Sequence, residues 1–354
     1  MWGIGMNKKR IIAARGNGRV TLVEEAIPEI KPGSLLVEVH NSLVSPGSEV
    51  GGWRNLHNQQ SSSSSESQSR PFGYANAGIV EEVGESVTKF KPGDRVACMG
   101  GGYALHSNYA VVPHNLCVAL PDNVTFAQGA YGHLAATAVH VFRRGQSSFG
   151  EFVAVVGLGV LGQLCAMIHR LAGSLVIGWD AIPFRAETAK NWGIDTVAIP
   201  GKEDEVEITR AFTDGQGLDT AVIAFGGDAN MAVQQLQKCF KCSPDGHLMG
   251  RLMIPGGAWF DFPRTITNMD ICRVGRTGPG YHDEEWEFGV DYPPVVMRWT
   301  TQTNLKLCMR LISEGKFNVD AITTHKIPLV DVESRLAEII QKPDKMLGIV
   351  FEMN

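Results

Sequence analysis

Apolar and polar positions alternate in short runs through the first third of the chain. The runs are RIIAA, RVTLVEE, SLLVEVHNS, GIVEEVG, DRVACMG and YAVVP, and Gly/Pro turns such as KPGS and KPGD separate several of them. Alternation with a period of two is typical of half-buried strands, because successive side chains point to opposite faces of a sheet. The pattern predicts a β-rich domain built as an irregular barrel or sandwich.

The pattern changes at about Ala127, where strands begin to alternate with helices. Six further strand-like runs follow, with helical segments between most of them: FVAVVG, SLVIGWD, DTVAI, DTAVIAF, HLMGRL and ITNMDICRV. This alternation is typical of a doubly wound parallel sheet, so the fold class is α/β with a dinucleotide-binding domain. We predict that this domain spans residues 127–290 and that residues 1–126 form the β-rich domain. The tail, residues 291–354 with the helix NLKLCMRLISEG, should pack back on the β-rich domain.

A glycine-rich turn follows the first of these later strands. Gly157, Gly159 and Gly162 fit the pattern G-x-G-x-x-G, with Val160 and Leu161 between the last two glycines. The first glycine permits a tight turn, the second lets the backbone approach a pyrophosphate, and the third lets helix and strand pack closely. The helix N-terminus then offers backbone N–H groups to phosphate. The alternative is a structural glycine turn in some other α/β fold.

Asp180 ends the next strand and supports the nucleotide interpretation. Its carboxylate can accept hydrogen bonds from an adenosine ribose diol and would repel a 2′-phosphate, which favours NAD(H) over NADP(H). Arg185, five residues further on, either stacks on the adenine or is a solvated helix residue.

Composition and charge narrow the class of protein. The 354 residues carry a net charge of −5, 44% of them are hydrophobic, and the basic residues are scattered. This argues against a nucleic-acid or membrane partner, and no apolar run approaches the ~20 residues of a membrane helix. Seven cysteines at wide spacing favour reduced thiols and a cytoplasmic location.

The serine-rich tract Ser61–Arg70 is either a mobile loop over the substrate site or a solvated insertion.

The order of these motifs resembles the medium-chain dehydrogenase/reductase superfamily, which comprises the zinc alcohol and polyol dehydrogenases and their zinc-free relatives. The resemblance rests on KPGDRV, GAYGHLAATAVHVFRRG, VVGLGVLGQL and SEGKFNVDAITTHKIPL, and it covers nearly the whole chain. It implies a GroES-like catalytic domain, a Rossmann domain and an NAD-dependent alcohol dehydrogenase or reductase. Members commonly pair through the edge strand of the dinucleotide domain, here ITNMDICRVG, so a homodimer or homotetramer is also implied.

The residues that hold catalytic zinc in this superfamily are replaced in this sequence. Ser45 stands where the superfamily has a ligand cysteine, and Tyr74 and Ala75 stand in place of a His-Glu pair. His133 stands where the polyol enzymes place a third ligand. A catalytic zinc site needs about three ligands of N, S or carboxylate type, and of these residues only His133 qualifies. We therefore expect no catalytic zinc.

A narrower zinc-free group shares two further features with the chain. These are the motif V-S-x-G-S/T-E and the run RTGPGYHDE…DYPPVVMRWT. The group includes the chlorophyllide-type dehydrogenases and the N-terminal half of two-domain oxidoreductases found with sugar and polysaccharide genes. The chain resembles this group in motif.

Without zinc, a side chain must take the hydroxyl proton when an alcohol is oxidised to a ketone, a contribution of roughly 10²–10⁴-fold. His133 is the first candidate base, because imidazole titrates near neutral pH; the alternative is a histidine of the core or helix surface. The phenol of Tyr74 either donates to a carbonyl or relays a proton, or its ring only lines the site. Ser45 fills the vacated ligand position, and Ser48 on the same turn is a candidate substrate contact. Glu49 either braces an arginine or binds a substrate hydroxyl.

Three further candidate substrate contacts follow the last predicted strand. They are Tyr281, Asp283 and Arg298. Charged and aromatic residues in a Gly/Pro-rich loop could clamp a polyhydroxylated or acidic substrate. The alternative is a hinge held together by its aromatic residues.

The leading hypothesis is NAD-dependent interconversion of a secondary hydroxyl and a ketone on a small molecule, namely a sugar, cyclitol or related polyol. The first alternative is reduction of an activated C=C bond, as in zinc-free enoyl and quinone reductases, since an enolate oxygen needs only hydrogen-bond donors. The second alternative is a non-catalytic protein that binds NAD(H).

Overall fold

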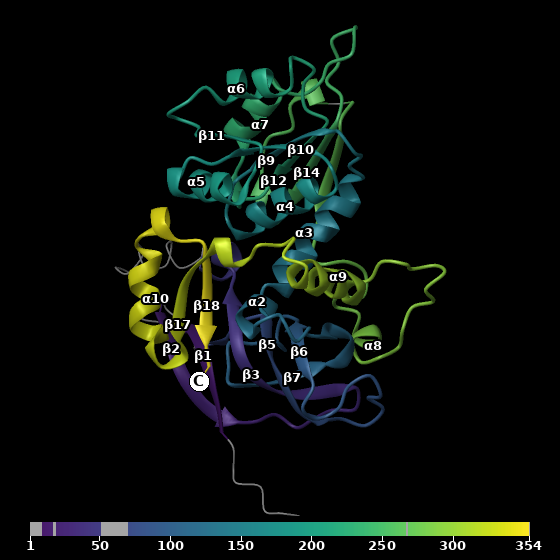
Figure 1. Cartoon of the computed structure of the whole chain (residues 1–354), viewed down its shortest axis with the longest axis vertical. Coiled ribbons are helices and arrows are strands. Elements are labelled where there is room, and N and C mark those ends of the chain that lie inside the picture. The colour runs from purple at the N-terminus through teal and green to yellow at the C-terminus, as the bar shows by residue number, and fades with distance from the viewer. Residues whose placement is uncertain (1–8, 17–18, 51–69, 267, 354) are drawn as a thin grey trace, which may run out of the picture. The chain divides into compact units, whose positions relative to one another are not determined.

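The computed structural model describes residues 9–16, 19–50, 70–266 and 268–353, and it divides into two compact units (Figure 1). The first unit comprises residues 1–133, 279–313 and 323–354, and the second comprises residues 134–278 and 314–322. Each unit is therefore assembled from separate stretches of the chain. Apart from Arg70, the serine-rich tract lies outside the described residues. Within the described part of the chain, no helix is both long enough and apolar enough to cross a membrane.

The first unit is built on a seven-stranded sheet in the order β17-β18-β3-β5-β6-β8, with β7 paired to β3. The strands are β3 (Ser34–Val44), β5 (Ala75–Val83), β6 (Arg95–Met99), β7 (Tyr109–Pro113), β8 (Cys117–Ala119), β17 (Thr323–Pro328) and β18 (Gly348–Glu352). β3, β5, β6 and β7 coincide with alternating runs of the sequence. The strand β18, near the C-terminus, pairs antiparallel with β3, so the C-terminal segment completes a sheet begun in the first part of the chain.

A smaller sheet and short helices complete the first unit. The sheet has the order β2-β1-β4, with β1 (Lys9–Gly16), β2 (Arg19–Ala26) and β4 (Arg70–Pro71). The helices are α2 (Phe126–Gly129), α8 (Glu284–Glu287), α9 (Thr301–Ser313) and α10 (Val332–Ile340). α9 packs against the start of α3 (Gly132–Gly145), where a Cβ on Gly132 would lie 2.4 Å from Leu305 Cδ1. Because Gly132 has no side chain, α9 can pack closely against α3 at the position just before His133.

The second unit contains a six-stranded parallel sheet in the order β11-β10-β9-β12-β14-β16. The strands are β9 (Phe152–Val156), β10 (Leu175–Trp179), β11 (Thr196–Ala198), β12 (Thr220–Ile223), β14 (Arg251–Pro255) and β16 (Asp270–Val274). Numbered along the chain this is the order 3-2-1-4-5-6 of dinucleotide-binding folds. The predicted α/β fold with a doubly wound sheet is confirmed.

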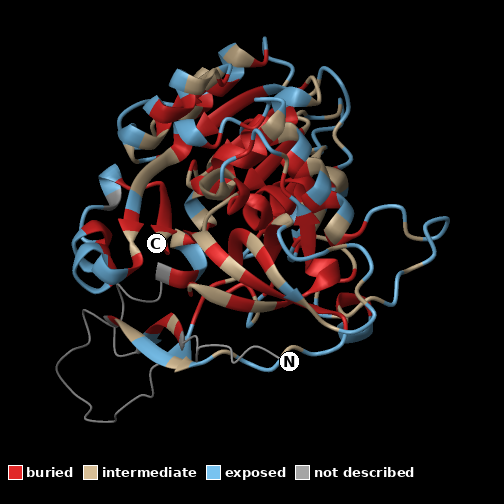
Figure 2. Cartoon of the chain, turned by 60° about the horizontal axis from the view of Figure 1, so that its bottom comes forward, coloured by how far each residue is buried: buried red, intermediate tan, exposed pale blue. Residues whose placement is uncertain are grey.

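Helices and a short ribbon surround this sheet. The helices are α4 (Val160–Leu171), α5 (Pro183–Trp192), α6 (Glu205–Phe212) and α7 (Asn230–Leu236), together with most of α3. The ribbon joins β13 (Gly227–Asp228) to β15 (Ala258–Trp259). The sheet residues Ala154, Ile177 and Ala221 have no exposed surface and lie in the core of the unit; buried residues are red in Figure 2. β16 lies at one edge of the sheet.

His169, on α4, is buried without a polar contact. Neither ring nitrogen has a hydrogen-bond partner among the described residues, and the ring of Phe142 packs edge-on at 5.2 Å. Burial, and to a smaller extent the charge of Arg251, lowers the pKa of His169 to about 3. The folded second unit therefore excludes the protonated form of this side chain.

We expect His169 to destabilise the protein as the pH falls from about 6.5, the usual histidine pKa, toward 3. In this window the unfolded chain binds a proton that the folded chain does not, so the free energy of unfolding falls by up to about 1.4 kcal/mol per pH unit. Urea unfolding at about pH 7, 6 and 5 should show a flatter pH dependence for His169→Met. His247→Met, at an exposed histidine, should keep the original slope, and equal slopes in all three proteins would contradict the assignment.

Candidate functional site

The first unit brings four of the predicted residues together: Ser45, Ser48, Tyr74 and His133. Ser48 Oγ donates to Ser45 Oγ at 2.8 Å and lies 2.6 Å from Tyr74 Oη. Hydroxyl protons can rotate, so either Ser48 or Tyr74 can be the donor in the contact between them. The rings of Tyr74 and His133 lie 4.3 Å apart. We call Ser45, Ser48 and Tyr74 the hydroxyl cluster.

Local backbone geometry presents the three hydroxyls. Ser45 follows β3, and the next residues, Pro46–Val50, form a single π-helical turn. Glu49 N donates to Ser45 O at 2.9 Å, and Ser45 N donates to Glu49 Oε2 at 2.6 Å, so the turn is closed in both directions. Tyr74 follows Gly73, whose φ of 121° and tight approach to the backbone exclude a side chain there.

His133 is buried beside the hydroxyl cluster. Its Nδ1 lies 3.1 Å from Tyr74 O and donates to this carbonyl, so Nε2 carries the lone pair of the neutral ring. Burial lowers the pKa of His133 to about 4, and the Tyr74 carbonyl opposes part of this shift. The imidazole is therefore neutral at neutral pH. The expectation that it titrates near pH 7 does not fit this environment, because the ring has lost the water that would stabilise its charge.

Tyr74 keeps its proton throughout the neutral range. Burial and the negative charge of Glu49 raise the pKa of Tyr74 well above its usual value of 10.0, and hydrogen bonds from Ser45 and Ser48 offset part of the shift. The half-buried phenol is therefore a hydrogen-bond donor rather than a base.

Glu49 is buried, and its carboxylate has partners within the first unit. One oxygen accepts the Ser45 N–H, and the other lies 3.3 Å from His106 Nε2. Arg15 is also present, but its guanidinium donates to the backbone oxygen of Glu49 at 3.0 Å and not to the carboxylate. The side chain of Glu49 therefore holds the turn that carries the serines.

The three later candidates lie in different surroundings. The ring of Tyr281 lies 5.6 Å from that of His133, and its hydroxyl accepts the N–H of Gly101 at 2.8 Å, so Tyr281 borders the site. Asp283 is the N-cap of α8 and accepts from Trp286 N and the Tyr292 hydroxyl. Arg298 is exposed, with its guanidinium 4.4 Å from the Trp299 ring centre. Of the three, only Tyr281 is placed beside the cluster.

The donor set of this site is poor for a metal. Among the residues that the structure describes, no group of three or more His, Cys, Asp or Glu side chains is arranged to hold a metal ion. Ser45 and Tyr74 stand where the resemblance to the superfamily implies zinc ligands, and their hydroxyls are not the ligands that zinc prefers.

The glycine-rich turn of the second unit fits a dinucleotide. A Cβ on Gly162 would lie 1.8 Å from Gly157 O, whereas one on Gly159 would meet nothing within 4 Å. Gly162 thus permits close packing, and Gly159 leaves open space beside the backbone. Gly159 is the N-cap of α4 and supplies no side-chain cap. The first-turn N–H groups, those of Val160 and Leu161 among them, therefore have no capping side chain and suit a phosphate.

Asp180 combines a structural contact with capacity for a ligand. Its carboxylate accepts from Leu158 N at 2.7 Å and from Ile182 N at 2.8 Å, and Arg185 Nη1 lies 3.7 Å away. A carboxylate has about four acceptor positions, so two remain for ribose hydroxyls. The ion pair with Asp180 places Arg185 beside the predicted ribose position.

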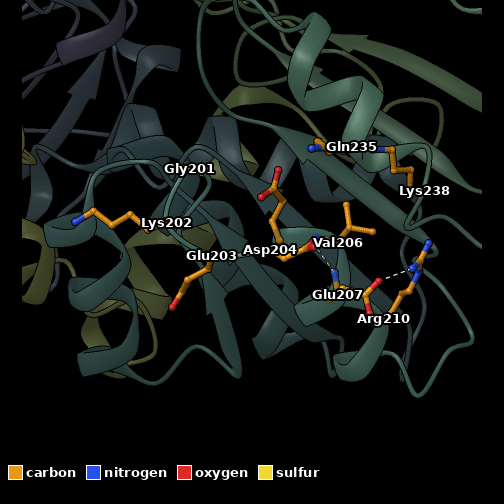
Figure 3. A pocket seen from close by; sticks show the side chains of 10 residues that line it. Gly201, Lys202, Glu203, Asp204, Val206, Glu207, Arg210, Gln235 and Lys238 are labelled. Atoms are coloured by element: carbon orange, nitrogen blue, oxygen red, sulfur yellow. Dashed lines mark hydrogen bonds and ion pairs between the residues drawn. The ribbon is translucent and has the colours of Figure 1, made fainter.

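A surface pocket of about 540 Å³ lies elsewhere in the second unit (Figure 3). Charged residues around the start of α6 line it, but several are already engaged. Asp204 caps α6, and Glu207 pairs with Arg210. None of the predicted site residues lines this pocket, so we assign no ligand to it.

Sequence reasoning did not identify His106 or Ser42, which lie behind the hydroxyl cluster. Ser42 Oγ lies 2.7 Å from His106 Nδ1. His106 follows a glycine-rich loop, and its partners come from β3 and the turn after it, far away in the chain. No local spacing signals such a pair.

Comparison with known proteins defines the class. Residues 31–122 match the alcohol dehydrogenase GroES-like domain. Probable D-xylulose reductase A of Aspergillus terreus is 24% identical, over 92% of this chain and 93% of that protein. Human sorbitol dehydrogenase is 31% identical over 56% of this chain and 62% of its own length. The solved alcohol dehydrogenase of Thermus sp. ATN1 is 19% identical, with a TM-score of 0.75 over 98% of this chain and 100% of that chain.

The GroES-like domain, the Rossmann sheet and these similarities define an oxidoreductase with the two-domain fold of the medium-chain dehydrogenases. Within that superfamily the chain is similar to zinc-type alcohol and polyol dehydrogenases, through residues 31–122 and the two sequence relatives. The expectation of a dehydrogenase or reductase is confirmed.

Proposed function

We propose that this oxidoreductase uses NAD(H) to interconvert a secondary hydroxyl and a ketone on a sugar, cyclitol or related polyol, without catalytic zinc. The observation that carries the proposal is the hydroxyl cluster beside His133, at positions where related enzymes place metal ligands. The likeness to a D-xylulose reductase and a sorbitol dehydrogenase supports a polyhydroxylated substrate.

The protonation states of Tyr74 and His133 determine what each can do in the reaction. Bound NAD(H) would supply or accept the hydride. In ketone reduction, the Tyr74 hydroxyl points its proton at the carbonyl oxygen and then transfers it, while Ser48 turns its own proton to Tyr74 Oη. The raised pKa of Tyr74 keeps the phenol protonated until that transfer. Ser48 and Ser45 orient the phenol through their hydrogen bonds. Alcohol oxidation reverses the same transfer and returns the proton to Tyr74 Oη. The alternative is that neutral His133 plays this role in both directions, through the Nε2 lone pair that it offers to the substrate hydroxyl.

Asp180 provides the cofactor preference. Titration with NADH and NADPH, followed by nicotinamide fluorescence, should show NADH binding at least tenfold tighter, because a 2′-phosphate would bring negative charge to a buried carboxylate. Asp180→Ser should lose most of this preference. A preference of the unaltered protein for NADPH would overturn the assignment and favour the enoyl or quinone reductase alternative.

A survey of ketoses and polyols identifies the reaction itself. D-xylulose with NADH and sorbitol with NAD⁺ are the first probes, because the names of the two relatives contain these compounds. Turnover of enones alone would contradict the proposed reaction.

We also propose that the protein is a homodimer or homotetramer that pairs through the edge strand β16. β16 has one strand neighbour, β14, and its residues Ile271 and Cys272 are only half-buried. Sedimentation velocity should give a mass of two or four chains.

A further inference from the structure

A second group of polar side chains lies behind the hydroxyl cluster in the core of the first unit. It consists of Ser42, His106 and Glu49. Ser42 and His106 have no exposed surface, and Glu49 is 3% exposed. Burying ionisable groups costs free energy unless they are paired, so such a group is a candidate for a functional role.

The contacts of this group run in one direction, toward the hydroxyl cluster. Ser42 Oγ lies 2.7 Å from His106 Nδ1, and His106 Nε2 lies 3.3 Å from Glu49 Oε1. The latter approach brings the ring against the carboxylate without the alignment of a hydrogen bond. The other oxygen, Glu49 Oε2, accepts the Ser45 N–H at 2.6 Å. One carboxylate therefore connects His106 to the backbone of Ser45, the residue that carries the first hydroxyl of the cluster.

The imidazole of His106 is held firmly in its position. The rings of Phe72 and Phe351 pack edge-on against it, with centres 4.7 Å and 5.0 Å away. Its backbone N–H donates to Phe72 O at 3.0 Å. With these contacts and Ser42, the ring has little freedom to turn away from Glu49.

We propose that Ser42, His106 and Glu49 form a brace that holds the Ser45 and Ser48 hydroxyls against Tyr74, and that His106 is a positioning residue for the reaction. This inference rests on the function proposed above, in which Tyr74 donates to the substrate oxygen. Displacement of such a donor by about 1 Å can lower a rate by up to 10²-fold, so a residue that touches no substrate can still affect turnover.

Three variants distinguish the brace from ordinary core packing. His106→Asn retains a polar group near Nδ1 for Ser42 but nothing that reaches Glu49. His106→Gln places an amide nitrogen near the position of Nε2 and can donate to the carboxylate. His114→Asn is the matched control, because His114 is also buried in the first unit but its Nδ1 lies 3.0 Å from Gly33 O, away from the hydroxyl cluster.

The first readout is amide hydrogen exchange at Ser45, which requires no substrate. Exchange should be at least about tenfold faster in His106→Asn, because Glu49 is then free to leave the Ser45 N–H. His106→Gln and His114→Asn should exchange within about threefold of the unaltered protein. Unchanged Ser45 exchange in His106→Asn would overturn the proposal.

The second readout is steady-state reduction of D-xylulose, or of the best ketose in the survey, by NADH. We expect kcat to fall about tenfold in His106→Asn with KM within about twofold, and His106→Gln to recover most of it. Faster Ser45 exchange with unchanged kcat would also overturn the positioning role. If the unaltered protein reduces no ketose, the proposed function fails, and Ser45 exchange alone decides whether the brace exists.

Discussion

Tyr74→Phe should lower kcat for ketone reduction by about 10²–10³-fold while leaving NADH affinity unchanged. The phenol is hydrogen-bonded to Ser48, and its raised pKa keeps it protonated at neutral pH. A general acid contributes roughly 10²–10⁴-fold to rate, so its removal should have the largest effect of any single hydroxyl in the protein. The ring itself remains in Phe, so the packing against His133 is preserved.

Tyr103→Phe is the matched control for this experiment. Tyr103 lies in the same unit and is half-buried, but its ring packs against Phe288 rather than the hydroxyl cluster. Stopped-flow and steady-state rates of D-xylulose reduction by NADH should be the same in Tyr103→Phe and the unaltered protein. If Tyr74→Phe kept full turnover, the proton donor would have to be another group, and His133→Ala would then be the next test.

Gly162→Ala and Gly159→Ala should fail in different ways. At Gly162 the new Cβ would meet the Gly157 carbonyl oxygen at 1.8 Å, so strand and helix must move apart. Forcing an atom into such a contact typically costs about 1–3 kcal/mol. We expect a lower urea midpoint and loss of measurable NADH binding. At Gly159 nothing lies within 4 Å, so Gly159→Ala should fold normally.

In Gly159→Ala, NADH binding should be weakened while stability is unchanged. The added methyl group would occupy the open space where a pyrophosphate approaches the backbone, so NADH affinity should fall at least tenfold with an unchanged urea midpoint. Fluorescence titration and urea unfolding of both variants separate these effects. Full NADH affinity in Gly159→Ala would contradict the placement of the pyrophosphate at this turn.

Features set by neighbouring residues could be predicted from the sequence. The strands β3, β5, β6 and β7 follow from period-two alternation, and the glycine turn with α4 follows from spacing and backbone geometry. By contrast, β8, β17 and β18 were not predicted as separate strands. They are short or lie in the C-terminal tail, and each forms by pairing with a strand outside its own segment: β8 with β6, β18 with β3, and β17 with β18.

The positions of the site residues could be predicted from the sequence, but their protonation states and distant contacts could not. The motif positions identified Ser45, Tyr74 and His133, and the structure brings them together. The low pKa of His133 follows from burial, which no residue type encodes. A role for His106 cannot be predicted from the sequence, because it depends on contacts with Glu49 and Ser42 that only the folded chain brings together.

Zinc content measured together with turnover is the most direct test of the central claim, that side chains perform the chemistry without a metal. The protein should be purified without a histidine tag, treated with dipicolinate and assayed with D-xylulose or the best ketose of the survey. We predict less than about 0.1 zinc per chain and unchanged kcat after chelation. About one zinc per chain, with activity lost on chelation and restored by added Zn²⁺, would contradict the claim.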